Sequence, residues 1–251
     1  MIAFISDIHA NLAALNAVLD DIEQVGGIKS IYCLGDVIGY GPEPVECFDI
    51  AARVSKLILL GNHEHAVLHG SYGFTPIAKR AVEWTRSVME KRRSRGRRQL
   101  DLMADLPTCH LFDDIMLVHG SPRDHVMEYV LESDTWEGSE PGKLAAIFQC
   151  FDRLCFVGHT HRPGVFTEDE CFLSSAELAD GFDVTDGSRY LINVGSVGQP
   201  RDRDPRACYT VFSGEAVYFR RVPYDIDRTT SLIHENPKLN NRLATRLYEG
   251  V

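Results

Sequence analysis

The sequence predicts an α/β fold in which two packed, mixed β-sheets are flanked by helices. In the first part of the chain, short apolar runs alternate with helical patterns, which is typical of parallel strands joined by helices. Further along, short strands follow one another closely, which indicates antiparallel pairing. No repeat or linker divides the 251 residues, so we expect one domain, 1–251, with a core over about 1–222 and a helical tail over about 225–251.

Local signals place the elements of the first part. Asn11 is a suitable N-cap for a helix whose apolar residues recur three and four positions apart, and two glycines end it at residue 26. Thr75 and Pro76 open a helix that extends to about Glu90. Two shorter helices are expected at Pro44–Arg53 and near Lys143–Asp152. The expected strands are Ile2–Ile5, Ile31–Leu34, Lys56–Leu60, Ile115–Val118 and Leu154–Val157.

The later part is expected to be rich in strands. Ser213 and Gly214 form a hairpin signal between two runs. Segment 174–189 has weak periodicity and is expected to be a surface excursion. From Asp225 onward the sequence is helical and amphipathic in pattern, with a break at Asn236 and Pro237. The expected strands of this part are Gly164–Thr167, Cys171–Leu173, Tyr190–Val194, Ala207–Phe212 and Glu215–Val222.

Charge and composition exclude several classes of protein. The formal net charge is −10, although six basic and no acidic side chains lie within residues 91–98. This argues against non-specific coating of nucleic acid and leaves open one local basic patch. No apolar run approaches the roughly 20 residues needed to cross a bilayer, and no signal peptide is expected. Seven cysteines without a C-x-x-C pair favour reduced thiols and a cytoplasmic location.

Five of the apolar runs end in polar residues of one chemical type. The five ends are Ser6-Asp7-Ile8-His9, Gly35-Asp36, Gly61-Asn62-His63-Glu64, His119-Gly120-Ser121 and Gly158-His159-Thr160-His161. Each residue alone has an ordinary explanation as a cap, turn former or surface histidine. If the five strands are parallel neighbours, however, their carboxyl ends meet at one edge, where α/β sheets bind ligands. In extended chain, residues two apart, such as Asp7 and His9, would point the same way.

The number and type of these side chains favour two metal ions. Two aspartates, one asparagine and five histidines, one of them spare, exceed what one tetrahedral zinc needs. They suit two ions roughly 4 Å apart that share a carboxylate, the arrangement used for in-line displacement at phosphorus. Imidazole, carboxylate and water ligands favour Mn or Fe, with Zn as an alternative.

The motif series D-x-H, G-D, G-N-H-E, H-G and G-H-x-H, in this order, resembles the calcineurin-like metallophosphoesterases. The segments at Asp36–Pro44, 118–124 and 193–202 extend the resemblance to the small single-domain bacterial and archaeal phosphodiesterase-like branch. It covers residues 1 to about 222 and implies a four-layer αββα sandwich.

The resemblance implies a role for each polar strand end. One metal ion would be held by Asp7, His9, Asp36 and His161, and the second by Asp36, Asn62, His119 and His159. His63 would act on the substrate as the catalytic residue that stabilises developing charge or protonates the leaving oxygen. Glu64 would orient His63, unless it is an ordinary solvated glutamate.

The expected reaction is in-line attack of a metal-bridging hydroxide on a phosphate ester. The expected substrates are phosphodiesters, nucleotides or dinucleoside polyphosphates, that is, phosphorylated small molecules. A protein serine/threonine phosphatase is the alternative, ranked lower because no large insertion is evident. A non-catalytic metal-binding scaffold is the third hypothesis. No membrane partner is expected, and the sequence does not define the oligomeric state.

Four further features have two readings each. Asn11 caps a helix and is also a candidate contact for the substrate phosphate. Arg201 is a candidate phosphate clamp or a surface salt-bridge partner. Tyr40 either lines the pocket or packs beneath its turn. Lys91–Arg98 is either a solvated, mobile helix end broken at Gly96, or a contact near the cleft for a phosphate-rich partner such as a nucleic acid.

Overall fold

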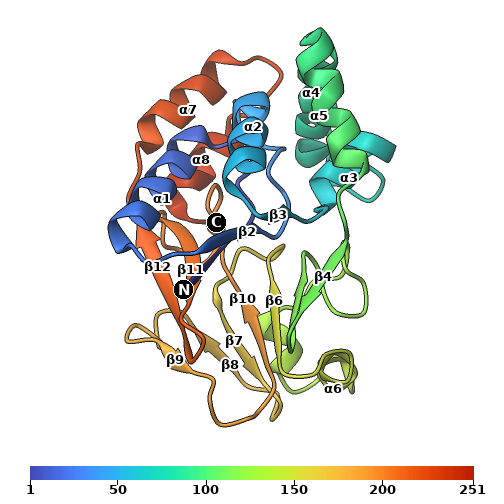
Figure 1. Ribbon diagram of the computed structural model, residues 1–251. Helices are drawn as coiled ribbons and strands as arrows, with labels where there is room; N and C mark the ends of the chain where they lie inside the picture. Colours follow the sequence, from blue (N-terminus) through green and yellow to red (C-terminus); the bar gives the residue numbers. More distant parts are fainter.

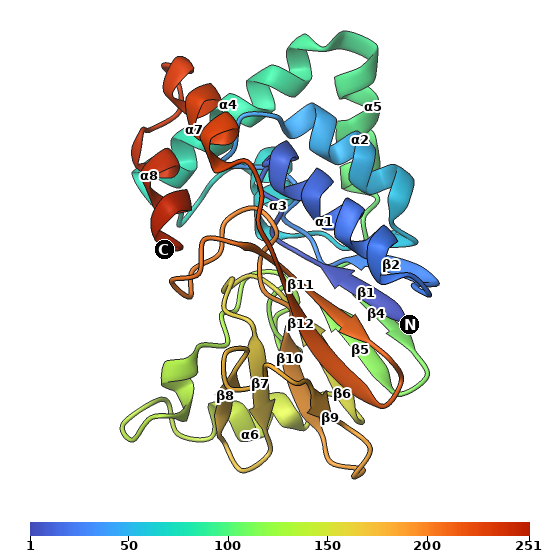
Figure 2. The same cartoon turned by 90° about the vertical axis from the view of Figure 1, so that its left-hand side faces the viewer.

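The structure, a computed structural model that describes residues 1–251, consists of two stacked six-stranded β-sheets with helices on the outside (Figure 1). The first sheet has the strand order β3-β2-β1-β11-β12-β9 and the second β4-β5-β6-β10-β7-β8. Figure 2 shows most helices covering the first sheet and α6 covering the second. The predicted fold class, two mixed sheets flanked by helices in four layers, is therefore confirmed.

The helices are α1 (Leu12–Val25), α2 (Pro44–Val54), α3 (Asn62–His69), α4 (Pro76–Lys91), α5 (Arg93–Ala104), α6 (Lys143–Phe148), α7 (Ile226–Glu235) and α8 (Arg242–Glu249). A 3₁₀ turn spans Glu132–Thr135. The strands of the first sheet are β1 (Ile2–Ile5), β2 (Ser30–Cys33), β3 (Leu57–Ile58), β9 (Phe182–Asp183), β11 (Ala207–Phe212) and β12 (Ala216–Val222). Those of the second are β4 (Cys109–Phe112), β5 (Ile115–Val118), β6 (Leu154–Val157), β7 (Gly164–Thr167), β8 (Phe172–Ser174) and β10 (Tyr190–Asn193).

Parallel pairs lie at one side of the first sheet and in the middle of the second, and the remaining pairs are antiparallel. Strands β1, β2 and β3 are parallel, and so are β5, β6 and β10. Strands β11 and β12 form the antiparallel hairpin predicted from Ser213 and Gly214. The carboxyl ends of the parallel strands of both sheets therefore face the same end of the molecule (Figure 1).

Alternating side chains along the strands build separate cores. On β1, Ala3 and Ile5 face the helices, whereas Phe4 faces the second sheet. Phe156 of β6 points back from that sheet, and its ring stacks on Phe4 with centroids 4.1 Å apart. This contact lies in the core between the sheets, directly behind the strand ends that carry the polar motifs.

Several elements differ from the sequence-based expectation. Helix α3 and the strands β4 and β9 were not predicted; β9 lies within the segment 174–189, for which a surface excursion was expected. Gly96 does not break the basic run but lies buried inside helix α5. A side chain at this position would collide with the backbone of Met89 in α4, so glycine permits the close approach of the two helices.

The C-terminal helices pack against the body of the protein. Helices α7 and α8 share a small apolar core with Ala81 of α4, formed mainly by Ile233, Leu243 and Leu247. Tyr40 contacts this core from the loop after β2. The expected single domain with a tail from about residue 225 stays a prediction. None of the helices has both the length and the apolar character required to cross a membrane.

Candidate metal centre

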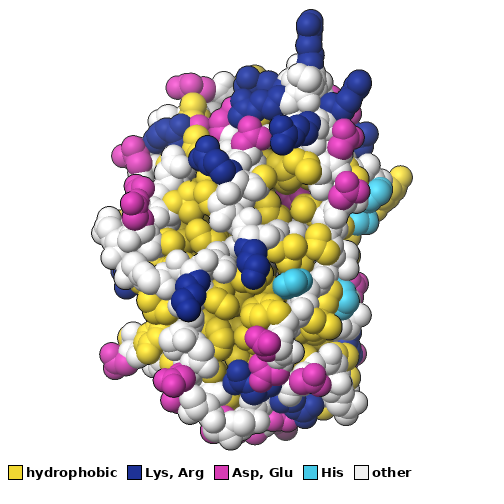
Figure 3. Space-filling model, in the orientation of Figure 1, with side chains coloured by type: hydrophobic (Ala, Val, Ile, Leu, Met, Phe, Trp, Pro, Cys, Tyr) yellow, Lys and Arg dark blue, Asp and Glu magenta, His cyan; other side chains and the backbone are white.

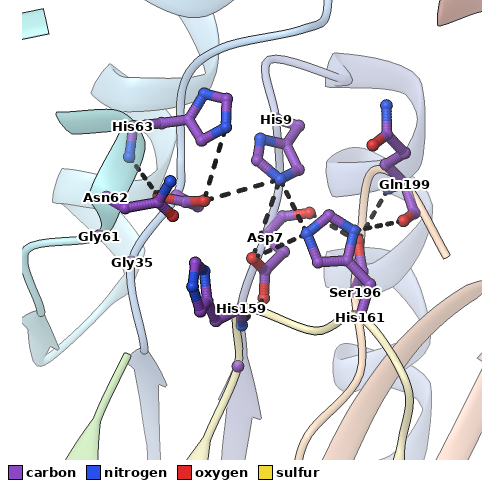
Figure 4. A network of polar contacts seen from close by, with 12 residues as sticks. Asp7, His9, Gly35, Gly61, Asn62, His63, His159, His161, Ser196 and Gln199 are labelled. Carbon is purple, nitrogen blue, oxygen red and sulfur yellow. Dashed lines mark hydrogen bonds and ion pairs between the residues drawn. The ribbon is translucent and has the colours of Figure 1, made fainter. Parts of the chain in front are cut away.

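The five polar strand ends meet at one place, but they come from two sheets. Asp7, Asp36 and Asn62 follow β1, β2 and β3 of the first sheet, whereas His119 and His159 follow β5 and β6 of the second. The condition stated for their convergence, that the five strands are parallel neighbours, is therefore met only within each sheet and not across all five strands. The side chains converge because the two sheets are stacked with their parallel strands ending at the same edge (Figure 4).

The backbone at these positions is turned, not extended. Asp7 and His9 have φ values of 53° and 47°, Asp36 has 52°, and His159 and His161 have 65° and 60°. Non-glycine residues adopt this left-handed conformation rarely, and each costs roughly 1–3 kcal/mol. The idea that Asp7 and His9 point the same way along extended chain is corrected: tight left-handed turns aim them together. Strain concentrated on five neighbouring polar residues is typical of a functional site.

The side chains form two groups that meet at Asp36. Asp7, His9 and His161 form one group, with the Nε2 atom of His161 3.1 Å from the Oδ1 atom of Asp7 and 3.1 Å from the Nε2 atom of His9. Asp36, His119 and His159 form the other group. The Oδ2 atom of Asp36 lies between them, 3.8 Å from Nε2 of His9 and 3.5 Å from Nε2 of His119. The Oδ1 atom of Asn62 lies 3.1 Å from Nε2 of His119.

Backbone carbonyl groups select which nitrogen of three histidines faces the centre. The Nδ1 atoms of His9, His119 and His161 lie 3.1, 2.8 and 2.5 Å from the carbonyl oxygens of Ile38, Leu34 and Gln199. A carbonyl oxygen only accepts hydrogen bonds, so each Nδ1 carries the proton and each Nε2 of the neutral ring presents a lone pair. His159 uses the opposite nitrogen, because its Nε2 lies 3.2 Å from the carbonyl oxygen of Met127.

These protonation states make a cation fit the centre. With Nδ1 protonated, the facing Nε2 atoms of His9 and His161 both present lone pairs and cannot bond each other. The Oδ1 atom of Asp7 is buried without a hydrogen-bond partner. Buried acceptors that face one another without a donor are the arrangement expected around a metal ion. The seven predicted ligands thus suit metal binding, while their individual assignment stays a prediction.

His63 lies beside the centre without being fixed like the other rings. Its Nε2 atom is 4.0 Å from Oδ2 of Asp36, and its Nδ1 atom is buried without a partner. The ring contacts Phe74 edge-on and Tyr40 at a tilt. By distance His63 could join His9 and Asp36 in holding an ion. The absence of an orienting carbonyl group separates it from the four rings discussed above and agrees with a role in proton transfer.

Glu64 has a structural role that differs from both roles expected from the sequence. Its carboxylate is fully buried and accepts N–H groups from Asp36, Ile38 and Gly61 at 2.8, 3.1 and 3.1 Å. It makes no hydrogen bond to His63, so it is neither the predicted orienting partner nor a solvated side chain. The spacing from Gly61, the N-cap of α3, to a glutamate three residues later is a capping-box pattern that could have revealed this role.

Electrostatic interactions within the centre keep its aspartates ionised. Burial on its own would raise the pKa of Asp7, but the neighbouring histidines, His161 above all, together hold the pKa below its ordinary value. Burial on its own would lower the pKa of His119, but the surrounding carboxylates, Asp36 above all, together raise the pKa to about 9. Burial lowers the pKa of His63 to about 4. A divalent ion bound by His119 would therefore displace a proton.

An aromatic pocket adjoins the centre. It has a volume of about 260 Å³ and is bordered by Asn62 and His159. Its apolar lining residues are Tyr40, Tyr72, Phe74, Ala78, Met127 and Tyr129. The ring of Tyr129 stacks on His159 with centroids 3.7 Å apart. Tyr40 therefore lines the pocket and also packs on the turn. Of the lining residues other than Tyr40, Asn62 and His159, none was predicted to line a pocket, since Thr75 and Ala78 belong to the start of α4 and the others lie in loops without a periodic pattern.

The two candidate substrate contacts lie at different depths. Asn11 is buried; its Oδ1 atom accepts from Ala14 N and Thr229 Oγ1, and its amide donates to the carbonyl oxygen of Gly198. This is the capping role, and a phosphate contact by Asn11 stays a prediction. Arg201 is partly buried, and no carboxylate lies within ion-pair distance, so the salt-bridge alternative is wrong.

The basic run does not border the cleft. Lys91–Arg98 forms the junction of α4 and α5 at one end of the molecule, and none of its side chains lines the aromatic pocket (Figure 1). Arg95 pairs with Asp49 and Glu46 of α2. The idea of a phosphate-rich partner bound near the cleft by this run is corrected, whereas nucleic-acid binding by the run elsewhere stays a prediction.

A strained cluster of imidazole and carboxylate groups at the seam of a two-sheet sandwich defines the class of metallophosphoesterases. The chain belongs to the calcineurin-like phosphoesterase superfamily, whose domain profile matches residues 1–216. The resemblance drawn from the five motifs is thus confirmed. The protein is a hydrolase that acts on phosphate esters, and phosphoesterases of this family use divalent metal ions.

Relatives match the chain over its whole length. The uncharacterized protein MJ0912 of Methanocaldococcus jannaschii is 36% identical over 255 residues, covering 100% of this chain and 98% of the relative. The crystal structure of a metallophosphoesterase from Sphaerobacter thermophilus has 38% identity, the same coverage of both chains and a TM-score of 0.83. The hypothetical protein PH1004 from Pyrococcus horikoshii OT3, at 20% identity and a TM-score of 0.76, shows the fold alone.

Proposed function

We propose that the protein hydrolyses small phosphate esters with two divalent metal ions held by the seven ligands named above. The observation that carries this proposal is the pair of side-chain groups with the Asp36 carboxylate between them, and with the Nε2 atoms of His9, His119 and His161 turned inward. Mn or Fe is the expected metal, with Zn as the alternative. When bound, two such ions activate a water molecule and neutralise the phosphate oxygens.

The residues of the chain have separate tasks in this reaction. Asp7, His9 and His161 hold one ion, Asn62, His119 and His159 hold the other, and Asp36 contributes to both. His63, which has no partner on Nδ1, faces the reacting phosphate and exchanges a proton with the leaving oxygen. Glu64 fixes the backbone of Asp36 and Gly61, so it positions a ligand without touching the substrate.

The aromatic pocket favours substrates whose leaving group is a planar organic group. Tyr72, which is 91% exposed, and Tyr129, which is 43% exposed, offer flat faces beside Asn62 and His159. Stacking on such rings favours planar groups, including nucleobases and aryl esters. This supports phosphodiesters, nucleotides and dinucleoside polyphosphates as the substrate class. No specific contact favours a phosphoprotein, so the protein phosphatase hypothesis stays ranked second. The scaffold hypothesis is wrong, since the chain is a hydrolase by family.

A substrate panel tests the proposal. The purified protein is stripped with a chelator, reloaded with Mn, Fe or Zn, and assayed on bis(p-nitrophenyl) phosphate, nucleotides, dinucleoside polyphosphates and phosphopeptides. We expect no hydrolysis after stripping, recovery with about two ions per chain, and faster turnover of the diesters and nucleotides. Activity that survives complete removal of metal would contradict the proposal, and a preference for phosphopeptides would favour the alternative.

A further inference from the structure

Two arginines from distant parts of the chain lie over Tyr40. Arg201 follows β10, and Arg246 belongs to the C-terminal helix α8. Their guanidinium carbons are 5.9 and 6.0 Å from the centroid of the Tyr40 ring. Figure 3 shows one face of the molecule, with a lysine or arginine side chain beside a histidine near its middle, among apolar side chains. Neither arginine belongs to the basic run, and the proposed reaction does not use Arg246.

Neither guanidinium pairs with the carboxylate of an aspartate or a glutamate. Other partly buried arginines pair with acids, as Arg221 does with Asp202 and Asp204. Arg201 donates from its side chain only to Oε1 of Gln199, and its Nε atom is buried without a partner. The Nε atom of Arg246 donates to the backbone oxygen of Val251. Two partly desolvated cations around one ring, neither facing an acidic side chain, are costly, and a bound anion offsets that cost.

The pair borders the metal centre. Tyr40, which lies under both guanidinium groups, packs against the rings of His9 and His63 with centroids 4.7 and 4.4 Å apart. The backbone N–H of Arg201 donates to the carbonyl oxygen of His161, 3.2 Å away. Arg201 thus sits in the same segment as Gln199, whose carbonyl group orients His161. An anion held by the pair would lie next to a phosphate at the centre.

The tail holds Arg246 in place. Leu243 and Leu247, on either side of it in α8, are buried against α4 and α7. The backbone N–H of Arg203 donates to the carbonyl oxygen of Gly250, with an N–O distance of 2.8 Å. This hydrogen bond connects the end of α8 to the segment that contains Arg201. The two arginines are therefore presented as a preorganised pair, which lowers the entropy cost of binding an anion.

We propose that Arg246 and Arg201 form a subsite for a second phosphate group of the substrate, next to the phosphate that is hydrolysed. Guanidinium groups bind phosphate oxygens bidentately, and two of them suit a polyphosphate chain better than a monophosphate. The subsite rests on the proposed function and narrows it to nucleoside or dinucleoside polyphosphates. Burial, and then the charge of Arg201, lower the pKa of Arg246, in agreement with two guanidinium groups near each other.

Equilibrium binding tests the subsite without turnover. Calorimetry gives the Kd of orthophosphate and of pyrophosphate for the Mn-loaded protein, and the ratio of the two is compared between wild type and variants. For Arg246→Met, which keeps an apolar stem over Tyr40, we expect the preference for pyrophosphate to fall about tenfold. Arg246→Lys should lose part of that preference. Arg242→Ala, an exposed arginine in the same helix, should leave it unchanged.

Different experimental outcomes contradict the subsite and the proposed function. If Arg246→Met weakens both anions equally, or neither, the subsite is wrong, provided that its melting temperature matches that of Arg242→Ala. If Arg246→Met melts early, Arg246→Lys replaces it, and an unchanged ratio in that variant also overturns the subsite. Failure of the wild-type protein to hydrolyse any ester with metal would refute the proposed function, while the two Kd values would still report on Arg246.

Discussion

Gly39 packs against the imidazole ring of His63 so closely that a methyl group at residue 39 would overlap the Nδ1 atom. Gly39 also has a φ of 86°, a conformation that favours glycine. The loop after β2, together with Phe74, therefore sets the position of the His63 ring. Because this ring has no orienting carbonyl group, packing alone holds it.

Gly39→Ala should displace His63 and slow turnover about 100-fold, since a shift of roughly 1 Å at a reacting group has this effect. Metal content should stay unchanged, because His63 is not an assigned ligand. The matched control is Gly187→Ala, where φ is 82° but no atom lies within 4 Å of the added methyl group. Equal loss of activity in both variants would mean that backbone strain, and not the contact with His63, is responsible.

His63→Ala should retain both ions and lose about 10²- to 10⁴-fold in kcat, the range for removal of a general acid or base. Metal content by mass spectrometry and kcat on a chromogenic diester are the two measurements. His65→Ala, two residues along α3 on a less buried ring, serves as the control. Wild-type turnover by His63→Ala would refute the assigned role, and loss of an ion would make His63 a ligand.

Asp36→Asn should weaken metal binding more than any other single ligand change, because Asp36 alone faces both groups. We expect a loss of affinity beyond the roughly 10- to 100-fold that removal of an outer-shell partner costs. Competition with a metal indicator measures it. Asp180→Asn, on an exposed loop, controls for the change in charge. Stronger loss with Asp7→Asn would show that the ions do not share Asp36.

Glu64→Gln should lower the melting temperature by roughly 6–12 °C, because a carboxylate that accepts three buried N–H groups is replaced by an amide with its own donors. Calorimetry of the metal-free protein isolates this effect from metal binding. Glu23→Gln, exposed on α1, provides the reference. Glu64 would have no structural role of this size if the two variants melted at the same temperature.

The sequence predicted the strands and the ligand residues better than the way in which they meet. Polar residues such as Asp36 and His119 are conspicuous because each follows a short apolar run. The strands before these residues belong to two different sheets, which pack together through contacts such as that between Phe4 and Phe156. No local sequence pattern encodes such a contact. Left-handed turns at His9 and His161 are likewise settled by tertiary contacts, since neither residue is a glycine.

Short or exposed elements escaped prediction for a different reason. Strand β9 has two residues, too few for a period of two to be visible. Helix α5 contains Gly96 and a cluster of like charges, both unfavourable in an isolated helix, and is stabilised by its contact with α4. Arg246 lies beyond the motifs altogether, so only the docking of α8 beside Tyr40 draws attention to it.

Each ligand group draws on both sheets: Asp7 and His9 come from the first and His161 from the second, while Asp36 comes from the first and His119 and His159 from the second. A chain in which only one sheet has formed therefore possesses no complete group. Metal affinity therefore reports whether the two sheets are packed together. Ions that bind only to the packed arrangement also stabilise it relative to states in which the sheets have separated.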